Sequence, residues 1–133
     1  MDLRANSTFR AGQWSAFEAR LVPLLVAAAK KAAAPVFAES QTLVHVRSGE
    51  LRASGAVTTE WTGRRVSAFI AYSAPYAAYN EFGTGVRGQS SEWAGPYDYR
   101  QDWPGMRPIP FLRPALDHGR DSILDAYKSV FQV

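Results

Sequence analysis

Cysteine is absent from this 133-residue chain, and histidine occurs only twice. Without thiols the chain can form no disulfide, no thiolate nucleophile and no cysteine-ligated zinc site. His45 and His118 lie in different segments, so neither a two-histidine metal site nor a histidine-based triad is indicated. No catalytic residues, metal site, cofactor or small-molecule substrate are predicted, and the protein is not expected to be an enzyme.

Long hydrophobic runs are also lacking. The most apolar stretch, Leu21 to Ala38, is interrupted by Pro23, Pro35 and two lysines. A bilayer-spanning helix needs roughly 20 predominantly apolar residues. The first residues contain no apolar segment of the kind that a signal peptide requires. The sequence therefore predicts a soluble protein, made in the cytosol and without a membrane partner.

A large excess of one charge is missing as well, because the net charge is only +3. Residues 1–66 hold nine Lys and Arg against five Asp and Glu, whereas residues 67–133 hold six against seven. The basic residues of the first half form no continuous block. This distribution gives weak support to nucleic acid as a partner.

Apolar and aromatic side chains, in contrast, are plentiful. Hydrophobic residues make up 47% of the chain, including four Trp, six Tyr and seven Phe. A chain of this size buries about two-thirds of its extended surface on folding. We expect a single domain, 1–133, with an N-terminal arm at 1–14 and a long aromatic loop at 84–107.

A long helix is predicted from Ser15 to about Glu39. One face carries an apolar residue every three or four positions, as amphipathic helices do: Phe17, Leu21, Leu24, Ala28 and Ala32. Pro23 predicts either a kink or a helix that begins near Val22. The small alanines at 27–29 and 32–34 would let another helix approach closely, from this subunit or a neighbour.

Further along, the pattern predicts a helical turn, a β-hairpin and two more helices. Ser48 is expected to cap the turn at 48–54, and Gly63 lies in the hairpin loop. The predicted elements are strands at 56–61 and 66–72, a helix from Ser73 to Gly83 with Pro75 in its first turn, and a helix from Arg113 to Phe131 with an inner face of Leu116, Ile123, Tyr127 and Val130. The fold class is α+β, with a long N-terminal helix and a C-terminal helix packed on a small antiparallel β-sheet.

Residues 83–88 match the dinucleotide-binding pattern G-x-G-x-x-G. That motif works between a strand and the N-terminus of a helix, where backbone amides meet a pyrophosphate. Here a helix precedes the glycines, and residues 89–92 begin no helical pattern. We interpret the match as a helix stop and the entry to a loop.

The 84–107 loop lacks periodicity and carries Trp93, Tyr97, Tyr99 and Trp103. Interleaved with arginines 87, 100 and 107, these rings could stack on bases and bind phosphates. The same residue types are enriched at protein–protein contacts. A third interpretation is that the loop folds back on its own domain and buries the rings.

Three segments occur in an order that resembles a known family. They are VRSGELRAS at 46–54, YAAYNEFGTG at 76–85 and PIPFLRPAL at 108–116. They look like the gene-product-ten-like minor structural proteins of lambda-like (HK-type) tailed phages, which are head–tail joining or tail-completion components. The similarity covers a little over half of the chain, and the stretch from Gln89 to Met106 is longer and more aromatic than the family pattern.

The resemblance implies a structural virion protein at the neck or tail end, present in the host cytoplasm during assembly. It implies a ring-shaped homo-oligomer and contacts with other phage neck, tail or connector proteins; the alternative is a small DNA-binding accessory protein of phage or prophage origin, with weak nucleic-acid contact. Glu81 lies in the last turn of a helix, where the dipole disfavours an anion, so we expect Arg113 or Arg52 to hold it. The motif residues expected to hold the fold are Gly49, Leu51, Arg52, Glu81, Gly83, Phe111, Arg113 and Pro114.

Overall fold

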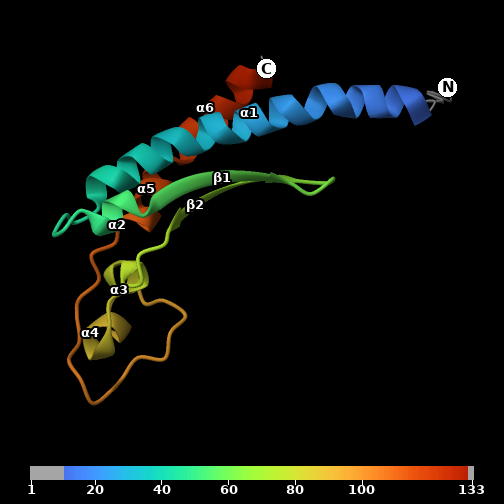
Figure 1. The fold of residues 1–133 in the computed structure, drawn as a ribbon. Helices are drawn as coiled ribbons and strands as arrows, with labels where there is room; N and C mark the ends of the chain where they lie inside the picture. The colour runs from blue at the N-terminus through green and yellow to red at the C-terminus, as the bar shows by residue number, and fades with distance from the viewer. Residues whose placement is uncertain (1–10, 132–133) are drawn as a thin grey trace, which may run out of the picture.

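The computed structural model describes residues 11–131 and shows an elongated α+β molecule (Figure 1). An upper body combines the longest helix, a two-stranded antiparallel sheet and the C-terminal helices, while a lower lobe hangs beneath it. The predicted fold class is confirmed. The elements in order are α1 Ala11–Leu43, α2 Glu50–Ala53, β1 Gly55–Trp61, β2 Val66–Tyr72, α3 Ala77–Phe82, α4 Gly85–Gln89, α5 Leu112–His118 and α6 Arg120–Phe131.

Helix α1 runs without interruption through both of its prolines, Pro23 and Pro35. Figure 1 shows it curving gently along its length, and a start near Val22 is wrong. Residues 11–14 of the predicted N-terminal arm belong to this helix, and residues 1–10 lie outside the described part of the chain.

The alanine-rich part of α1 is buried against α6. Ala28 and Ala29 have no exposed surface, and small side chains let two helix backbones come close together. The contact of Glu39 with His118 at the end of α5 and that of Lys31 with Ser129 of α6 show that α5 and α6 run antiparallel to the rear of α1. The close partner of the alanine face is therefore a helix of the same subunit.

The front of the predicted apolar face of α1 is not buried. Phe17 and Leu24 are about half exposed, because they lie N-terminal to the section of α1 that α6 covers. The predicted stripe is therefore correct at Ala28 and Ala32 and wrong at these two bulky residues.

By length and composition, Ser15–Leu43 of α1 is apolar enough to cross a membrane. Helices in the core of water-soluble proteins can pass the same test, and a helix that is apolar on most sides suits either setting. Here the alanines pack on α6, with Lys30 and Lys31 in the middle of the segment. The absence of a membrane partner stays a prediction.

The β-hairpin is confirmed, with Gly55 opposite Tyr72 and Trp61 opposite Val66. Gly63 in its loop has φ of 82°, a conformation that glycine adopts without steric cost. Helix α1 packs along both strands. In β1 the partly buried residues alternate with exposed ones, as expected for a sheet covered on one face.

The predicted C-terminal helix is two helices, α5 and α6, divided at Gly119. A Cβ at Gly119 would lie 2.5 Å from Val36 Cγ2, so the glycine allows close approach to α1. Ala115 and Ala126 are buried, whereas Leu116 is half exposed. Leu116 was wrongly placed on the inner face because a continuous helix was assumed across the break.

Three short helices also differ from the predictions. Helix α3 begins at Ala77 and not at Ser73. Helix α4 lies inside the 84–107 loop, where no helix was expected. At α2 the N-cap is Gly49, with φ of 82°, although Ser48 Oγ still accepts a hydrogen bond from the N–H of Glu50 at 3.4 Å.

A small core joins the two parts of the molecule. It is formed by Val44, Leu51, Ala74 and Phe111, and the ring of Tyr72 meets that of Phe111 edge-on, with centroids 4.8 Å apart. These residues come from the end of α1, from α2 and from the segments that enter and leave the lower lobe. The core therefore fixes the lower lobe to the body.

Candidate assembly surface

Glu81 is a buried carboxylate that holds the start of α5. Its Oε2 accepts hydrogen bonds from the backbone N–H groups of Phe111 and Leu112 at 2.9 and 3.0 Å, and its Oε1 accepts one from Arg113 at 2.9 Å. The first N–H groups of a helix have no partner within the helix, and that end of the helix favours an anion. The expected arginine side-chain partner is therefore wrong, because the donors are main-chain amides.

The two arginines proposed as partners of Glu81 have other contacts. Arg52 donates from Nε and Nη2 to the carbonyl of Gln41, at 3.0 and 2.8 Å, and so ties α2 to the end of α1. The guanidinium carbon of Arg113 lies 5.3 Å from the centroid of the Trp93 ring, which is cation–π distance. Arg52 and Arg113 thus hold the segments around the lower lobe in place.

The 84–107 loop is closed at its base. Thr84 and Met106 exchange two backbone hydrogen bonds of 2.9 and 3.1 Å, and the Thr84 hydroxyl accepts a third bond from the N–H of Met106. Gly83 has φ of 74°, and a Cβ there would lie 2.7 Å from the carbonyl oxygen of Met106. The close contact between the two ends of the loop therefore requires this glycine.

Helix α4 uses its free amides within the loop. The N–H groups of Val86 and Arg87 donate to the carbonyls of Trp103 and Pro104 at 3.1 and 3.0 Å. The element before the glycine motif is α3, and no strand lies there. The requirements for a pyrophosphate site are therefore not met at these glycines.

Two of the four predicted interface rings pack inside the lobe. The Tyr99 hydroxyl accepts a hydrogen bond from the N–H of Gly95 at 2.7 Å and donates to the carbonyl of Phe82 at 3.3 Å. Trp93 is partly buried beneath Arg113. For these two rings, the interpretation that the loop folds back on its own domain is the correct one.

The other two rings, together with part of Tyr99, line a groove of about 1190 Å³ between the lobe and the 45–52 segment. Tyr97 and Trp103 are 49% and 47% exposed, and Tyr79 of α3, which shares the groove, is 57% exposed. Ile109 and Arg47 also line it. Large rings left in contact with water around a concavity are typical of contact surfaces.

Charges at this groove are few and nearly balanced. Arg100 and Asp102 form a bidentate ion pair, in which Nε donates to Oδ1 at 3.1 Å and Nη2 donates to Oδ2 at 2.8 Å. The hydrogen bond from Arg100 lowers the pKa of the Asp102 carboxyl, and the same bond raises the pKa of Arg100. Arg47 makes no ion pair or hydrogen bond within residues 11–131, so its charge remains available to a partner.

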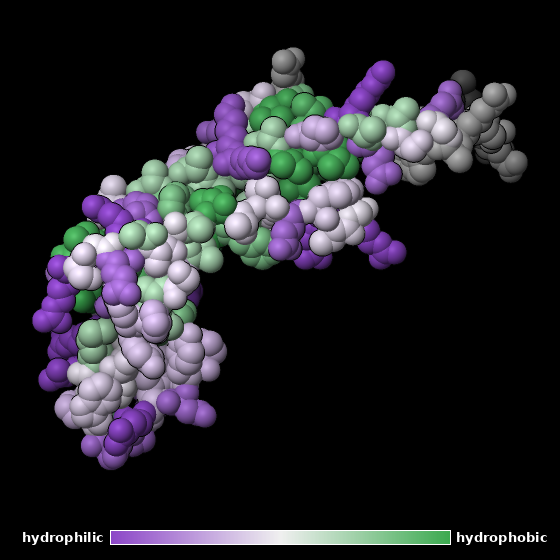
Figure 2. Space-filling view, in the orientation of Figure 1, coloured by the Kyte–Doolittle hydropathy of each residue, from purple (hydrophilic) through white to green (hydrophobic). Residues whose placement is uncertain are grey.

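A second apolar surface runs along the outside of α1 and α6. Figure 2 shows hydrophobic residues gathered where these helices lie together, whereas the lower lobe is paler because tyrosine and tryptophan have intermediate hydropathy. The exposed side chains of this second apolar surface are Phe17 and Leu24 of α1 and Leu124 and Phe131 of α6. Neither apolar surface is covered by the rest of the described chain.

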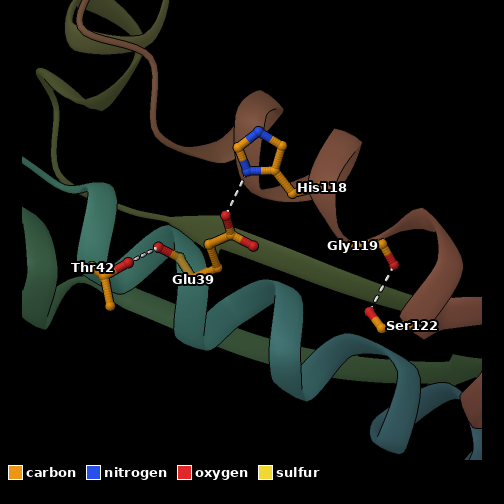
Figure 3. A network of polar contacts seen from close by, with 5 residues as sticks. All are labelled: Glu39, Thr42, His118, Gly119 and Ser122. Atoms are coloured by element: carbon orange, nitrogen blue, oxygen red, sulfur yellow. Dashed lines mark hydrogen bonds and ion pairs between the residues drawn. The ribbon is translucent and has the colours of Figure 1, made fainter.

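The histidines lie apart from each other. His118 Nδ1 contacts Glu39 Oε1 at 2.6 Å and links α5 to α1 (Figure 3). His45 lies on the wall of the groove. Among residues 11–131, no three His, Asp or Glu side chains lie close enough to hold a metal ion.

Sequence reasoning identified Tyr97 and Trp103 but missed Tyr79 and Ile109. Tyr79 shares a spacing of three residues with Tyr76 and Phe82, which places the three on one face of the predicted helix. A six-residue helix presents less than two turns, so spacing alone could not show which ring faces outward.

Comparison with known proteins identifies no relative of this chain. No family model, no curated protein and no solved structure matches this chain.

Proposed function

We propose that this protein is a structural subunit of a tailed-phage particle, a head–tail joining or tail-completion component that forms a ring of identical copies. The observation that carries the proposal is the aromatic groove. Tyr79 of α3 is half exposed, as are Tyr97 and Trp103 of the 84–107 loop, which is fixed at its base and inside. A rigid aromatic surface is suited to binding a protein, because little side-chain freedom is lost on contact.

The resemblance of segments 46–54, 76–85 and 108–116 to phage neck proteins supplies the setting. In this structure those segments build the small core, the Glu81 contact and the start of α5. They support the groove and contribute Tyr79 to it, whereas Tyr97 and Trp103 lie outside these segments. On this proposal, the three segments hold the fold, and the groove contacts the neighbouring copy in the ring.

The test is the mass of the protein in solution. We expect sedimentation across a concentration series, alone or with neck and connector proteins, to give species heavier than the 14.7 kDa monomer. Replacing both Tyr79 and Trp103 by Ala should weaken association by about a hundredfold or more, since an interface aromatic contributes about 2 kcal/mol. Because both rings are half exposed, the thermal melt should change little.

The matched control is Leu124→Ala, which removes an equally exposed apolar side chain from α6, on the other apolar surface. It should leave association intact if the groove is the contact. Loss of association in this control alone would move the contact to α6, and a strict monomer that ignores every neck protein would contradict the proposed function.

A second candidate function is nucleic-acid binding, which one observation favours. The guanidinium of Arg47 at the groove has no ion-pair partner among residues 11–131, and it lies beside rings that could stack on bases. The nearly balanced charge of the surrounding residues argues against high affinity.

A further inference from the structure

Both outer edges of the sheet lack partners in the described chain. Within residues 11–131, strands β1 and β2 pair only with each other. No backbone group of residues 55–61 or 66–72 bonds to any other described segment. In an antiparallel pair, about half of the N–H and C=O groups of each strand point away from its partner. Two rows of main-chain donors and acceptors are therefore available.

These edges also lack the features that usually block strand addition. Edge strands in monomers are protected by proline, by lysine, by bulges or by being very short. Here each strand has seven residues in continuous register and no proline. Strand β2 carries no charge, and its Phe69 is 48% exposed. A two-stranded sheet of this kind is suited to extension by another strand.

We propose that neighbouring copies pair the β2 edge of one with the β1 edge of the next, so that the hairpins form one continuous antiparallel sheet. This inference rests on the proposed function, because it takes the partner to be a second copy. Rotation about a ring axis leaves all hairpins pointing the same way. In that arrangement β2 of one copy runs antiparallel to β1 of the next copy. Strand direction then alternates around the whole ring, and closing the ring leaves no strand edge unpaired.

Charge at the hairpin tip fits this arrangement. Glu60 is the only charged residue of β1, and Arg64 and Arg65 immediately precede β2. None of the three forms an ion pair within residues 11–131. With the hairpins in parallel orientation, the tips lie at one level, so Glu60 of one copy comes next to the arginines of its neighbour. A two-fold contact between two β1 edges would instead separate the tips.

The cysteine-free chain allows a direct test by disulfide crosslinking. A size-tagged Thr58→Cys variant is mixed and oxidised with Ser67→Cys, Phe69→Cys or Ala71→Cys. Side chains facing across an antiparallel pair come within disulfide distance, so we expect a mixed dimer between Thr58→Cys and one of the β2 variants. Ala38→Cys, an exposed position on α1, is the control and should not crosslink. Dimers of Thr58→Cys alone, or no crosslink in an oligomeric sample, would overturn the inference.

A second pair of variants covers the case in which a cysteine disturbs the hairpin. The double variant Thr58→Lys with Ala71→Lys adds like charges to both exposed strands and should weaken self-association at least about tenfold. The double variant to Val should preserve it. Oligomers that tolerate both lysines would refute strand pairing but leave the proposed function standing, whereas a wild-type protein that never associates would refute the proposed function itself.

Discussion

Glu81 shows how one side chain can join two parts of a small protein. It lies in the last turn of α3 in the lower lobe, yet its carboxylate accepts hydrogen bonds from three backbone amides at the start of α5 in the upper body. Hydrogen bonds to a charged group contribute more than neutral ones. Because the residue is buried, water cannot replace these bonds when the charge is removed.

We therefore expect Glu81→Gln to lower the free energy of unfolding by about 2–4 kcal/mol. The amide group would turn an N–H donor toward backbone donors that need an acceptor. Chemical denaturation measures the change. Glu92→Gln removes a charge from an exposed side chain in the same lobe and should be neutral within about 0.5 kcal/mol. Equal stability of both variants would mean that the Glu81 contact does not anchor the lobe.

Glu81 also shows which contacts could be predicted from the sequence and which could not. Its position at the C-terminal end of a helix indicated that a donor must hold it. The identity of the donor could not be inferred, since main-chain amides brought together by the fold leave no signature in side-chain identity. For the same reason Tyr97 and Tyr99 looked equivalent in sequence, although Tyr97 is half exposed and the hydroxyl of Tyr99 bonds within the lobe.

Among the elements, α1 and the hairpin were the most predictable, and the C-terminal helix was the least. The hairpin follows from residue type, and its register agrees with the expected strands. The division of the last helix at Gly119 depends on contact with Val36, more than 80 residues earlier in the chain. How much of the apolar face of α1 is buried depends on how far α6 extends along it. Local periodicity carries no information on that length.

The close packing of α1 and α6 leads to a prediction at this scale. Ala28 is fully buried, whereas its neighbour Ala27 is exposed. Ala28→Leu should force the helices apart and cost about 1–3 kcal/mol. Ala27→Leu adds the same side chain on the outer face and should change stability by less than about 0.5 kcal/mol. Thermal and chemical denaturation compare the two. If both were neutral, the helices would not be in tight contact.

For the whole molecule, salt dependence separates assembly from nucleic-acid binding. Binding that neutralises phosphates weakens steeply with salt, because counterions are released. With a net charge of +3, we expect weak, sequence-independent DNA binding that disappears near about 0.15 M salt. Association between copies through rings and main-chain bonds should persist there. Fluorescence anisotropy with labelled DNA and sedimentation of the same samples measure both, and sub-micromolar DNA affinity at that salt would favour the nucleic-acid candidate.

The closed base of the 84–107 loop has a consequence for how such a protein can change over evolution. Thr84 and Met106 join the ends of the loop by three hydrogen bonds, so insertions or deletions between them need not move α3 or α5. Lengthening a loop whose ends are already fixed adds little entropic cost, about 0.6 kcal/mol for each doubling. The loop can therefore vary as an exchangeable module, allowing specificity for a neighbour to diverge while the scaffold is inherited unchanged.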